Sequence, residues 1–135
     1  MQSLLLALAL LFAIPPGTIQ VTKVTWKPGP PSMPKGAQIA VLEGDQTKPG
    51  IFTLRLKMPR GSRVPPHWHP RPERVTVLSG EAQVGFGDKV SSDVTTFRAG
   101  SFYVNPPQSH HFVLFPQETV IQITGEGPWE VHPVE

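Results

Sequence analysis

The sequence predicts an all-β domain, and three observations support this fold class. Proline and glycine are abundant, at 17 and 12 of 135 residues, against usual frequencies of about 7% for glycine and 5% for proline. Apolar and polar residues alternate in many short segments, which is typical of half-buried strands. After residue 18 no segment keeps the helical period of about 3.6 residues. We therefore expect a β-sandwich or small barrel in a single domain.

The individual strands are predicted from this alternation and from the turns between them. The clearest is 51–58, where Phe52, Leu54, Leu56 and Met58 occupy every second position. Residues 27–36 are rich in Pro and Gly and predict a loop or an extended strap, because proline cannot donate to a ladder. The predicted strands are 19–26, 37–42, 51–58, 74–79, 81–86, 94–98, 102–105, 110–115 and 119–124, and residues 129–134 close the chain.

Residues 1–18 have the composition of a targeting segment. Residues 4–14 form an uncharged apolar run, shorter than the roughly 20 residues of a membrane-spanning helix and typical of the apolar core of a secretory signal. We expect residues 1–18 to be a signal peptide and 19–135 a single domain, with the protein secreted or periplasmic and without a stable membrane span. The alternatives are a retained anchor and an N-terminal strand or helix packed on the domain.

Charge and cysteine content exclude several functional classes. The 12 Lys and Arg residues nearly balance the 10 Asp and Glu residues, for a net charge of +2, so a nucleic-acid partner is not expected. The absence of cysteine excludes disulfides, thiolate metal sites, iron–sulfur clusters and cysteine nucleophiles.

Four of the five histidines lie in two short clusters. His67 and His69 are two residues apart, so both point to one face of an extended chain, and Glu73 follows four residues later. His110 and His111 come from a later strand. Imidazole and carboxylate ligands suit Zn, Cu, Fe, Mn, Ni or Co. This set predicts a site for one such divalent ion, with open positions for water, dioxygen or a substrate.

The first cluster resembles the first motif of the cupin superfamily, without a gap or substitution. It reads G-x5-H-x-H-x3-E-x6-G, from Gly61 through His67, His69 and Glu73 to Gly80.

The second cluster is similar to the second cupin motif, G-x5-P-x-G-x2-H-x3-N. Gly100, Pro106 and His111 match it, whereas Gln108 stands in place of the motif glycine and Phe115 in place of the asparagine. Phe115 shares parity with His111, which predicts a more apolar cavity.

The resemblance implies a double-stranded β-helix, or jelly-roll barrel, with one divalent transition metal inside. The metal ligands would be His67, His69, Glu73 and His111, and the three histidines would also be the catalytic residues. His110 is the alternative for the last ligand. If His111 fills that place, His110 points to the opposite face or serves in hydrogen bonding or proton transfer. Copper, iron and manganese are favoured, with zinc and nickel as alternatives.

Such a site predicts a secreted oxidoreductase that activates dioxygen or peroxide against a small organic or carbohydrate substrate. Copper-dependent oxidative cleavage of a polysaccharide is one version. The alternatives are a non-redox metal-dependent isomerase, lyase or hydrolase, and a non-catalytic cupin that binds a metal or a small ligand. A homodimer is expected, with residues 19–26 as the candidate contact.

Two tryptophans and one histidine remain near these clusters. Trp68 lies between two predicted ligands and by alternation points away from the metal, so packing is favoured over a stacking platform for a sugar. The same two roles are open to Trp129, and His132 stands alone without a predicted role.

Overall fold

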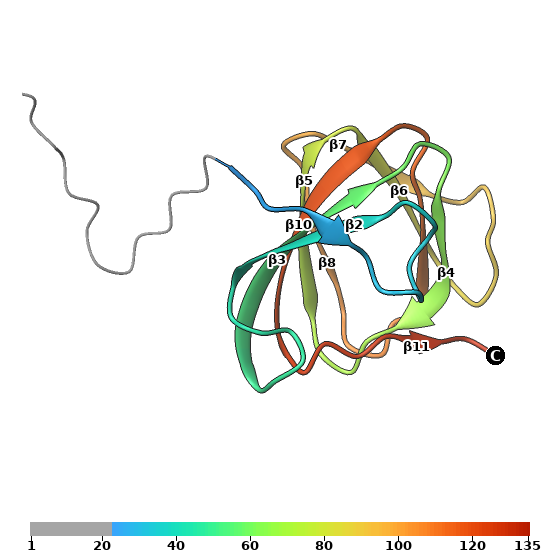
Figure 1. Ribbon diagram of the computed structural model, residues 1–135. Helices are drawn as coiled ribbons and strands as arrows, with labels where there is room; N and C mark the ends of the chain where they lie inside the picture. The colour runs from blue at the N-terminus through green and yellow to red at the C-terminus, as the bar shows by residue number, and fades with distance from the viewer. Residues whose placement is uncertain (1–22) are drawn as a thin grey trace, which may run out of the picture.

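Two antiparallel β-sheets face each other in the computed structural model, which describes residues 23–135 (Figure 1). The predicted signal peptide and residues 19–22 lie outside the described residues. Within this range no helix is long and apolar enough to cross a membrane. The strands are β1 (Lys27–Pro28), β2 (Gln38–Glu43), β3 (Gly50–Met58), β4 (Arg63–Trp68), β5 (Glu73–Ser79), β6 (Glu81–Phe86), β7 (Thr95–Arg98), β8 (Phe102–Asn105), β9 (His111–Leu114), β10 (Thr119–Gly127) and β11 (His132–Pro133).

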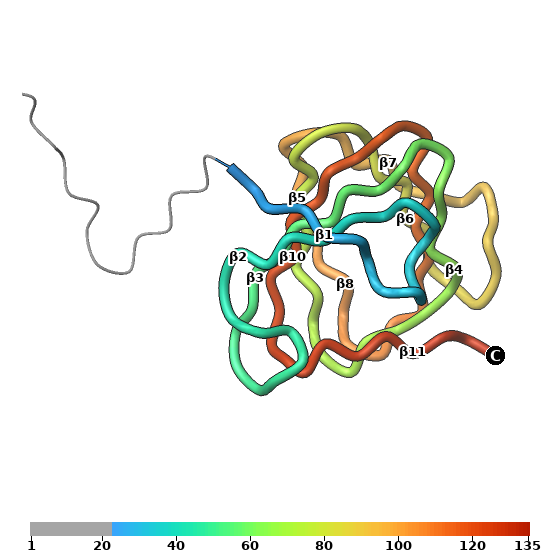
Figure 2. The backbone as a smooth tube through the Cα atoms, viewed as in Figure 1, coloured from blue at the N-terminus to red at the C-terminus, as the bar shows by residue number. Residues whose placement is uncertain are grey.

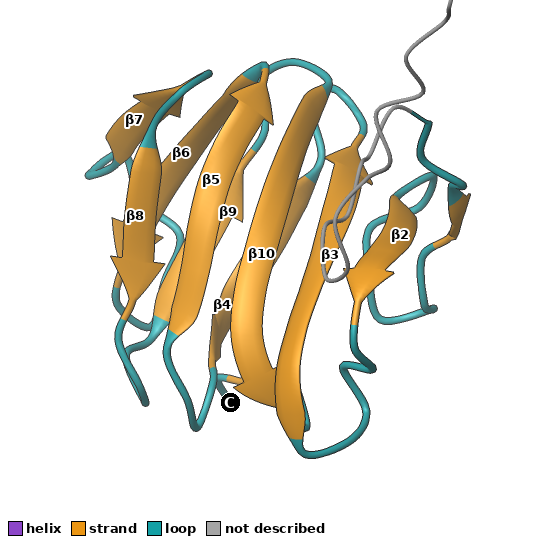
Figure 3. Cartoon of the chain, turned by 90° about the vertical axis from the view of Figure 1, so that its left-hand side faces the viewer, coloured by secondary structure: helices purple, strands orange, loops and turns teal. Residues whose placement is uncertain are grey.

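The order of the strands in the two sheets identifies the fold. One sheet has the order β1-β2-β3-β10-β5-β8 and the other β11-β4-β9-β6-β7; Figure 3 shows the first sheet in front, from β8 to β2. Strands far apart in sequence are neighbours, because β3 and β5 flank β10 while β4 and β6 flank β9. This is the double-stranded β-helix, or jelly-roll barrel, that the sequence predicts. It places both histidine clusters on adjacent strands.

The interior is built largely by β3 and β10, which pair along all nine residues of each strand. Leu54 lies opposite Ile123 and Leu56 opposite Ile121, and all four side chains are buried. Burying each such side chain stabilises the fold by about 1.5–3 kcal/mol. The alternation predicted for residues 51–58 is therefore confirmed.

The first predicted strand is wrong in its described part. Residues 23–26 form no strand, and the sheet begins with the two-residue β1 at its edge. Pro28 removes a donor from this edge, where only a short pairing with β2 remains. Trp26 contacts a side chain instead of joining a ladder, since the ammonium of Lys57 lies 4.7 Å from its ring centroid.

Two glycines of the first motif make a matched pair for mutation. Gly80 has a φ of +78°, and an added Cβ would meet the backbone of Glu118 and Thr119, with Thr119 Cα at 2.8 Å. Gly61 has a φ of +77° with nothing within 4 Å. We expect Gly61→Ala to lower the free energy of unfolding by about 1–2 kcal/mol and Gly80→Ala by at least about 3 kcal/mol. Urea unfolding measures both, and equal losses would contradict the close packing at Gly80.

Candidate metal centre

Three histidine side chains meet inside the barrel. His67 lies near the end of β4, His69 just beyond it, and His111 begins β9, and their possible ligand atoms all lie within 4.8 Å of one another. All three are buried. His67 and His111 are direct partners in the β4–β9 pair, with ring centroids 4.2 Å apart. The structure thus brings three of the four predicted ligands together, and we call them the histidine triad.

A bulge in β4 aims His67 inward. Sequence reasoning did not predict β4, because it contains two consecutive prolines that cannot donate to a ladder. Val64 pairs with Val113 and His67 with His111, so β4 has one more residue than β9 between these two pairs. The extra residue lets Val64 and His67, three positions apart, both face the interior.

Main-chain carbonyl groups orient all three rings. A carbonyl oxygen can only accept, so each Nδ1 carries the proton and each Nε2 is left as an acceptor. The Nδ1–O distances are 2.8 Å from His67 to Pro65, 2.8 Å from His69 to Glu130 and 2.9 Å from His111 to Ser109. The Nε2 atoms of His69 and His111 are buried and have no hydrogen-bond partner among the described residues.

These unpartnered nitrogens fit a metal. A buried polar atom without a partner costs about 1–3 kcal/mol, and a divalent transition ion would use the same lone pairs, because neutral imidazole is its usual nitrogen ligand. The triad therefore fits a metal site, as the sequence predicts. The identity of the metal stays a prediction.

Burial also favours the ligating form of His67 and His111. Burial, reinforced by the neighbouring His111, lowers the pKa of His67 from 6.5 to about 4. Burial likewise lowers the pKa of His111. Because a metal ligand must be the neutral imidazole, the lowered pKa values favour the form of both rings that binds an ion.

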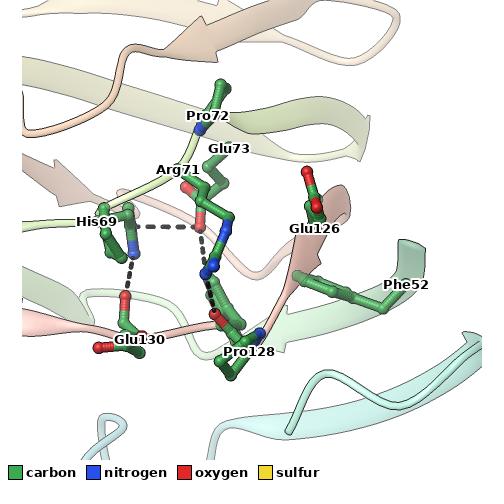
Figure 4. Close-up of a pocket in the computed structure, with 11 residues that line it drawn as sticks. Phe52, His69, Arg71, Pro72, Glu73, Glu126, Pro128 and Glu130 are labelled. Atoms are coloured by element: carbon green, nitrogen blue, oxygen red, sulfur yellow. Dashed lines mark hydrogen bonds and ion pairs between the residues drawn. The ribbon is translucent and has the colours of Figure 1, made fainter. Parts of the chain in front are cut away.

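Glu73, at the start of β5 in the opposite sheet, faces His69 (Figure 4). Its Oε2 lies 3.3 Å from His69 Nε2. Both atoms are acceptors when Nδ1 holds the proton, so a cation or a shared proton would make this contact favourable. Asn105 Nδ2 donates to Oε1 at 2.9 Å, and the indole N–H of Trp129 donates to Oε2 at 3.1 Å. These bonds orient the carboxylate beside the triad, while its role as a ligand stays a prediction.

The two adjacent histidines of the second cluster point in different directions. His111 belongs to the triad, whereas His110 is partly exposed and its Nδ1 lies 2.6 Å from Asp88 Oδ1. Successive residues entering a strand face opposite sides of the sheet. The structure therefore places His110 outside the site.

Gln108 makes the turn for which the motif has glycine. Its φ is +60°, in the left-handed region, and its N–H donates to the His69 carbonyl at 2.7 Å. Polar residues enter this region at a modest cost. Gln108 thus makes the same turn in place of the motif glycine, and its main-chain hydrogen bond connects the second histidine cluster to the first.

An apolar cavity of about 420 Å³ lies beside the triad. Its walls come from the loop 30–34, from the inner faces of strands in both sheets and from the C-terminal segment, with Leu56, Ile123 and Phe115 among the apolar residues. Phe115 therefore makes the cavity apolar, as its parity predicts. No Lys or Arg of the described chain lines it. The volume lies within the range of small-molecule sites.

The two tryptophans have different surroundings. Trp68 stacks on His132, with ring centroids 4.2 Å apart and an interplanar angle of 15°, so it packs away from the triad as predicted. Trp129 stacks on the ring of His69 at 6.0 Å and donates to Glu73. Sequence reasoning did not place Trp129 at the site, because its position depends on the return of the C-terminal segment.

This C-terminal segment, residues 128–134, runs back along β4 (Figure 2). The Val134 N–H donates to the Pro66 carbonyl at 3.1 Å, and Arg71 donates to the Pro128 carbonyl at 3.3 Å. The Glu130 carbonyl that orients His69 belongs to it (Figure 4). Sequence reasoning also missed Asn105, for which the alternation of β8 is the available signal.

Comparisons with known proteins agree with this architecture. The model of the ChrR cupin-like domain family matches residues 16–130. Germin-like protein 3-1 of Oryza sativa subsp. japonica is 39% identical over 66 residues, which cover 47% of this chain and 29% of that protein. The chain thus matches less than a third of that relative's length.

Solved structures share the fold at low sequence identity. The polyketide cyclase RemF from Streptomyces resistomycificus has a TM-score of 0.70 at 16% identity, covering 87% of this chain and 84% of that one. A putative acetylacetone dioxygenase from Methylibium petroleiphilum has a TM-score of 0.68 at 23% identity, covering 87% and 81%. With the family match spanning most of its length, this chain belongs to the ChrR cupin-like domain family of the cupin superfamily.

Proposed function

We propose that this cupin is a metal-dependent oxidoreductase acting on a small organic molecule held in the cavity. One divalent transition ion, with copper, iron or manganese favoured, would be held by Nε2 of His67, His69 and His111 and by the carboxylate of Glu73. When bound, such an ion supplies activation of dioxygen or peroxide. The observation that carries the proposal is the pair of unpartnered Nε2 atoms in a triad beside an apolar cavity.

The chain's own residues prepare this site in three ways. The carbonyl partners of Nδ1 fix the rings, so that their lone pairs converge without rearrangement. Glu73 adds one negative charge, which with three neutral imidazoles leaves a divalent site near +1. The apolar walls limit the water that reaches the substrate.

Redox chemistry is favoured over acid–base chemistry by the scarcity of titratable groups. Besides His67, His69 and Glu73, the only titratable side chain of the described residues that lines the cavity is Tyr103. A lyase or hydrolase that starts by removing a proton would need a positioned general base that is free of the metal, and the raised pKa of Tyr103 makes this phenol a poor base at neutral pH. A protein described as a putative acetylacetone dioxygenase has the same fold, so the fold is compatible with oxygen chemistry on a small organic molecule.

A small molecule is favoured over a polysaccharide by the position of the aromatic side chains. The indole of Trp129 donates a hydrogen bond to Glu73 inside the site, and the ring of Trp68 is covered on one face by His132. A polysaccharide would need an extended aromatic platform beside the metal. Neither tryptophan provides one, and among the described residues the exposed ring near the triad is the single Phe86, 6.3 Å from His111.

Metal analysis tests the proposal, using protein purified without a nickel column. We expect about one equivalent of copper, iron or manganese, and uptake of dioxygen or peroxide in the presence of oxidisable small molecules. Zinc would contradict the redox assignment and favour Lewis-acid catalysis. Ligand binding without turnover in the copper, iron and manganese forms would favour a non-catalytic binding protein.

Replacing Trp129 with Phe is expected to weaken metal binding by about 10–100-fold. The substitution keeps an aromatic ring against His69 but removes the hydrogen bond to Glu73, and loss of such supporting bonds has effects of this size. Trp68→Phe is the matched control, since that ring lies outside the triad. Competition with a chelator measures both variants. Equal affinities would show that Glu73 needs no support from Trp129 or is not a ligand.

Export and dimer formation are also part of the proposal. The apolar run in residues 4–14 supports secretion to the periplasm or the medium, and N-terminal sequencing of the exported protein should find residues 1–18 removed. The protein would also form a homodimer, and light scattering that gives the mass of one chain would contradict this.

A further inference from the structure

Tyr103 is the one tyrosine of the chain, and its side chain lines the cavity. It lies on β8 opposite Val75 of β5, one inward position before Asn105. Its ring stacks on Phe97 of β7, in the other sheet, with centroids 4.4 Å apart and an interplanar angle of 26°. The ring is therefore held by both sheets, which fixes its orientation at the cavity wall.

The hydroxyl of Tyr103 is free to bind a ligand. It forms no hydrogen bond with another residue in the described part of the chain. The residue is only 9% exposed, so solvent has little access to it. Burial, and then the charge of Glu73, raise the pKa of Tyr103. The phenol therefore stays protonated at neutral pH and can donate its hydrogen to an acceptor.

The remaining lining restricts the chemistry of that ligand. No cationic side chain of the described residues lines the cavity, so a carboxylate or phosphate would have no basic partner there. The other polar lining residues outside the metal centre are Ser32, Gln46 and Thr47, which lie in loops and are exposed or half-exposed. A sugar would leave most of its hydroxyl groups against aliphatic walls, at a cost for each unpaired group.

We infer that the cavity takes a small, neutral, largely apolar molecule with one hydrogen-bond-accepting oxygen, such as a ketone, and that the Tyr103 hydroxyl donates to this oxygen. Tyr103 then determines specificity, because a hydrocarbon of the same shape would leave its hydroxyl without a partner. This substrate class rests on the proposed function, since both concern the same cavity.

Two probes of the same shape test the inference. Acetophenone carries a carbonyl oxygen, and α-methylstyrene carries a methylene group in its place. Their affinities are measured by calorimetry on wild type, Tyr103→Phe and Ser32→Ala. Ser32→Ala is the matched control, because it removes one hydroxyl from an exposed part of the cavity lining. Zinc-loaded protein is used because zinc has no redox chemistry, and the series is repeated on the metal-free protein.

Wild type should bind acetophenone more tightly than α-methylstyrene. Tyr103→Phe should reduce this preference about fivefold to tenfold, as expected for the loss of one hydrogen bond, and Ser32→Ala should leave it unchanged. An unchanged preference in Tyr103→Phe, no preference in wild type, or no binding of either probe would overturn the inference. Because Tyr103 acts in the metal-free protein too, absence of oxygen chemistry or of metal would overturn only the proposed function.

A second measurement needs no variant. Tyrosine labelled with ¹³C at Cζ gives one signal in this chain, since Tyr103 is its single tyrosine. Acetophenone should shift that signal more than α-methylstyrene does at saturation. Equal shifts would overturn the inference even if Tyr103→Phe failed to fold.

Discussion

His69→Ala and His111→Ala are expected to lower the affinity for a divalent transition metal by at least about 100-fold. Loss of groups that merely support a ligand already has effects of about 10–100-fold, and each of these substitutions removes an Nε2 atom that has no other partner among the described residues. In the metal-free protein the same substitutions remove a buried unsatisfied nitrogen, but they also remove the Nδ1–H bond to a main-chain carbonyl and leave a cavity, so we expect some loss of stability.

The measurement is the rise in Tm that the metal produces, since an ion that binds only the folded state stabilises it. Wild type should show a clear rise, and both variants little or none. His110→Ala and His132→Ala are the controls, because their rings lie outside the triad, His110 on Asp88 and His132 on Trp68. Equal metal-induced shifts in all four variants would refute the site.

Acidification is expected to destabilise the metal-free protein strongly. The pKa of His67 is about 4 in the folded protein, against an ordinary value of 6.5 for histidine. Between these values the unfolded chain binds a proton that the folded protein excludes, so stability falls as the pH falls. By pH 4 the loss from this one group approaches about 3 kcal/mol. The lowered pKa of His111 acts in the same direction.

Urea unfolding at a series of pH values from 7 to 4 measures this loss. His67→Gln cannot titrate there, so its stability should fall less steeply with pH than that of wild type. Ser32→Ala, at an exposed position, removes no titratable group; it is the control and should keep the wild-type slope. Parallel curves for wild type and His67→Gln would contradict the burial of a neutral His67.

The fold and the first two histidines of the triad could be predicted from local spacing, and His111 from the resemblance to the second cupin motif. Residues 51–58 alternate without interruption, and the structure buries the predicted face. Two histidines that are two apart share a face, and the complete spacing from Gly61 to Gly80 carries the family resemblance. These patterns are read within a short stretch of chain, where alternation is a direct consequence of backbone geometry.

The rest depends on contacts between distant segments. β4 escaped prediction because a bulge accommodates its two prolines. Parity along the chain does not explain why Glu73 faces His69, since the chain crosses from one sheet to the other between them. Trp129 enters the site because the C-terminal segment returns beside β4, and no periodicity encodes that return.

The three carbonyl groups that orient the triad have a consequence for how this site can change during evolution. Each is part of the main chain, at Pro65, Ser109 and Glu130, and so it is offered by any amino acid that keeps the local backbone path. Substitutions at Pro65, Ser109 and Glu130 during evolution can therefore change the side chains, while the main-chain carbonyl groups still hold the proton on Nδ1 of each histidine. The part of the centre most exposed to inactivating drift is instead Glu73, because its two hydrogen-bond partners are the side chains of Asn105 and Trp129.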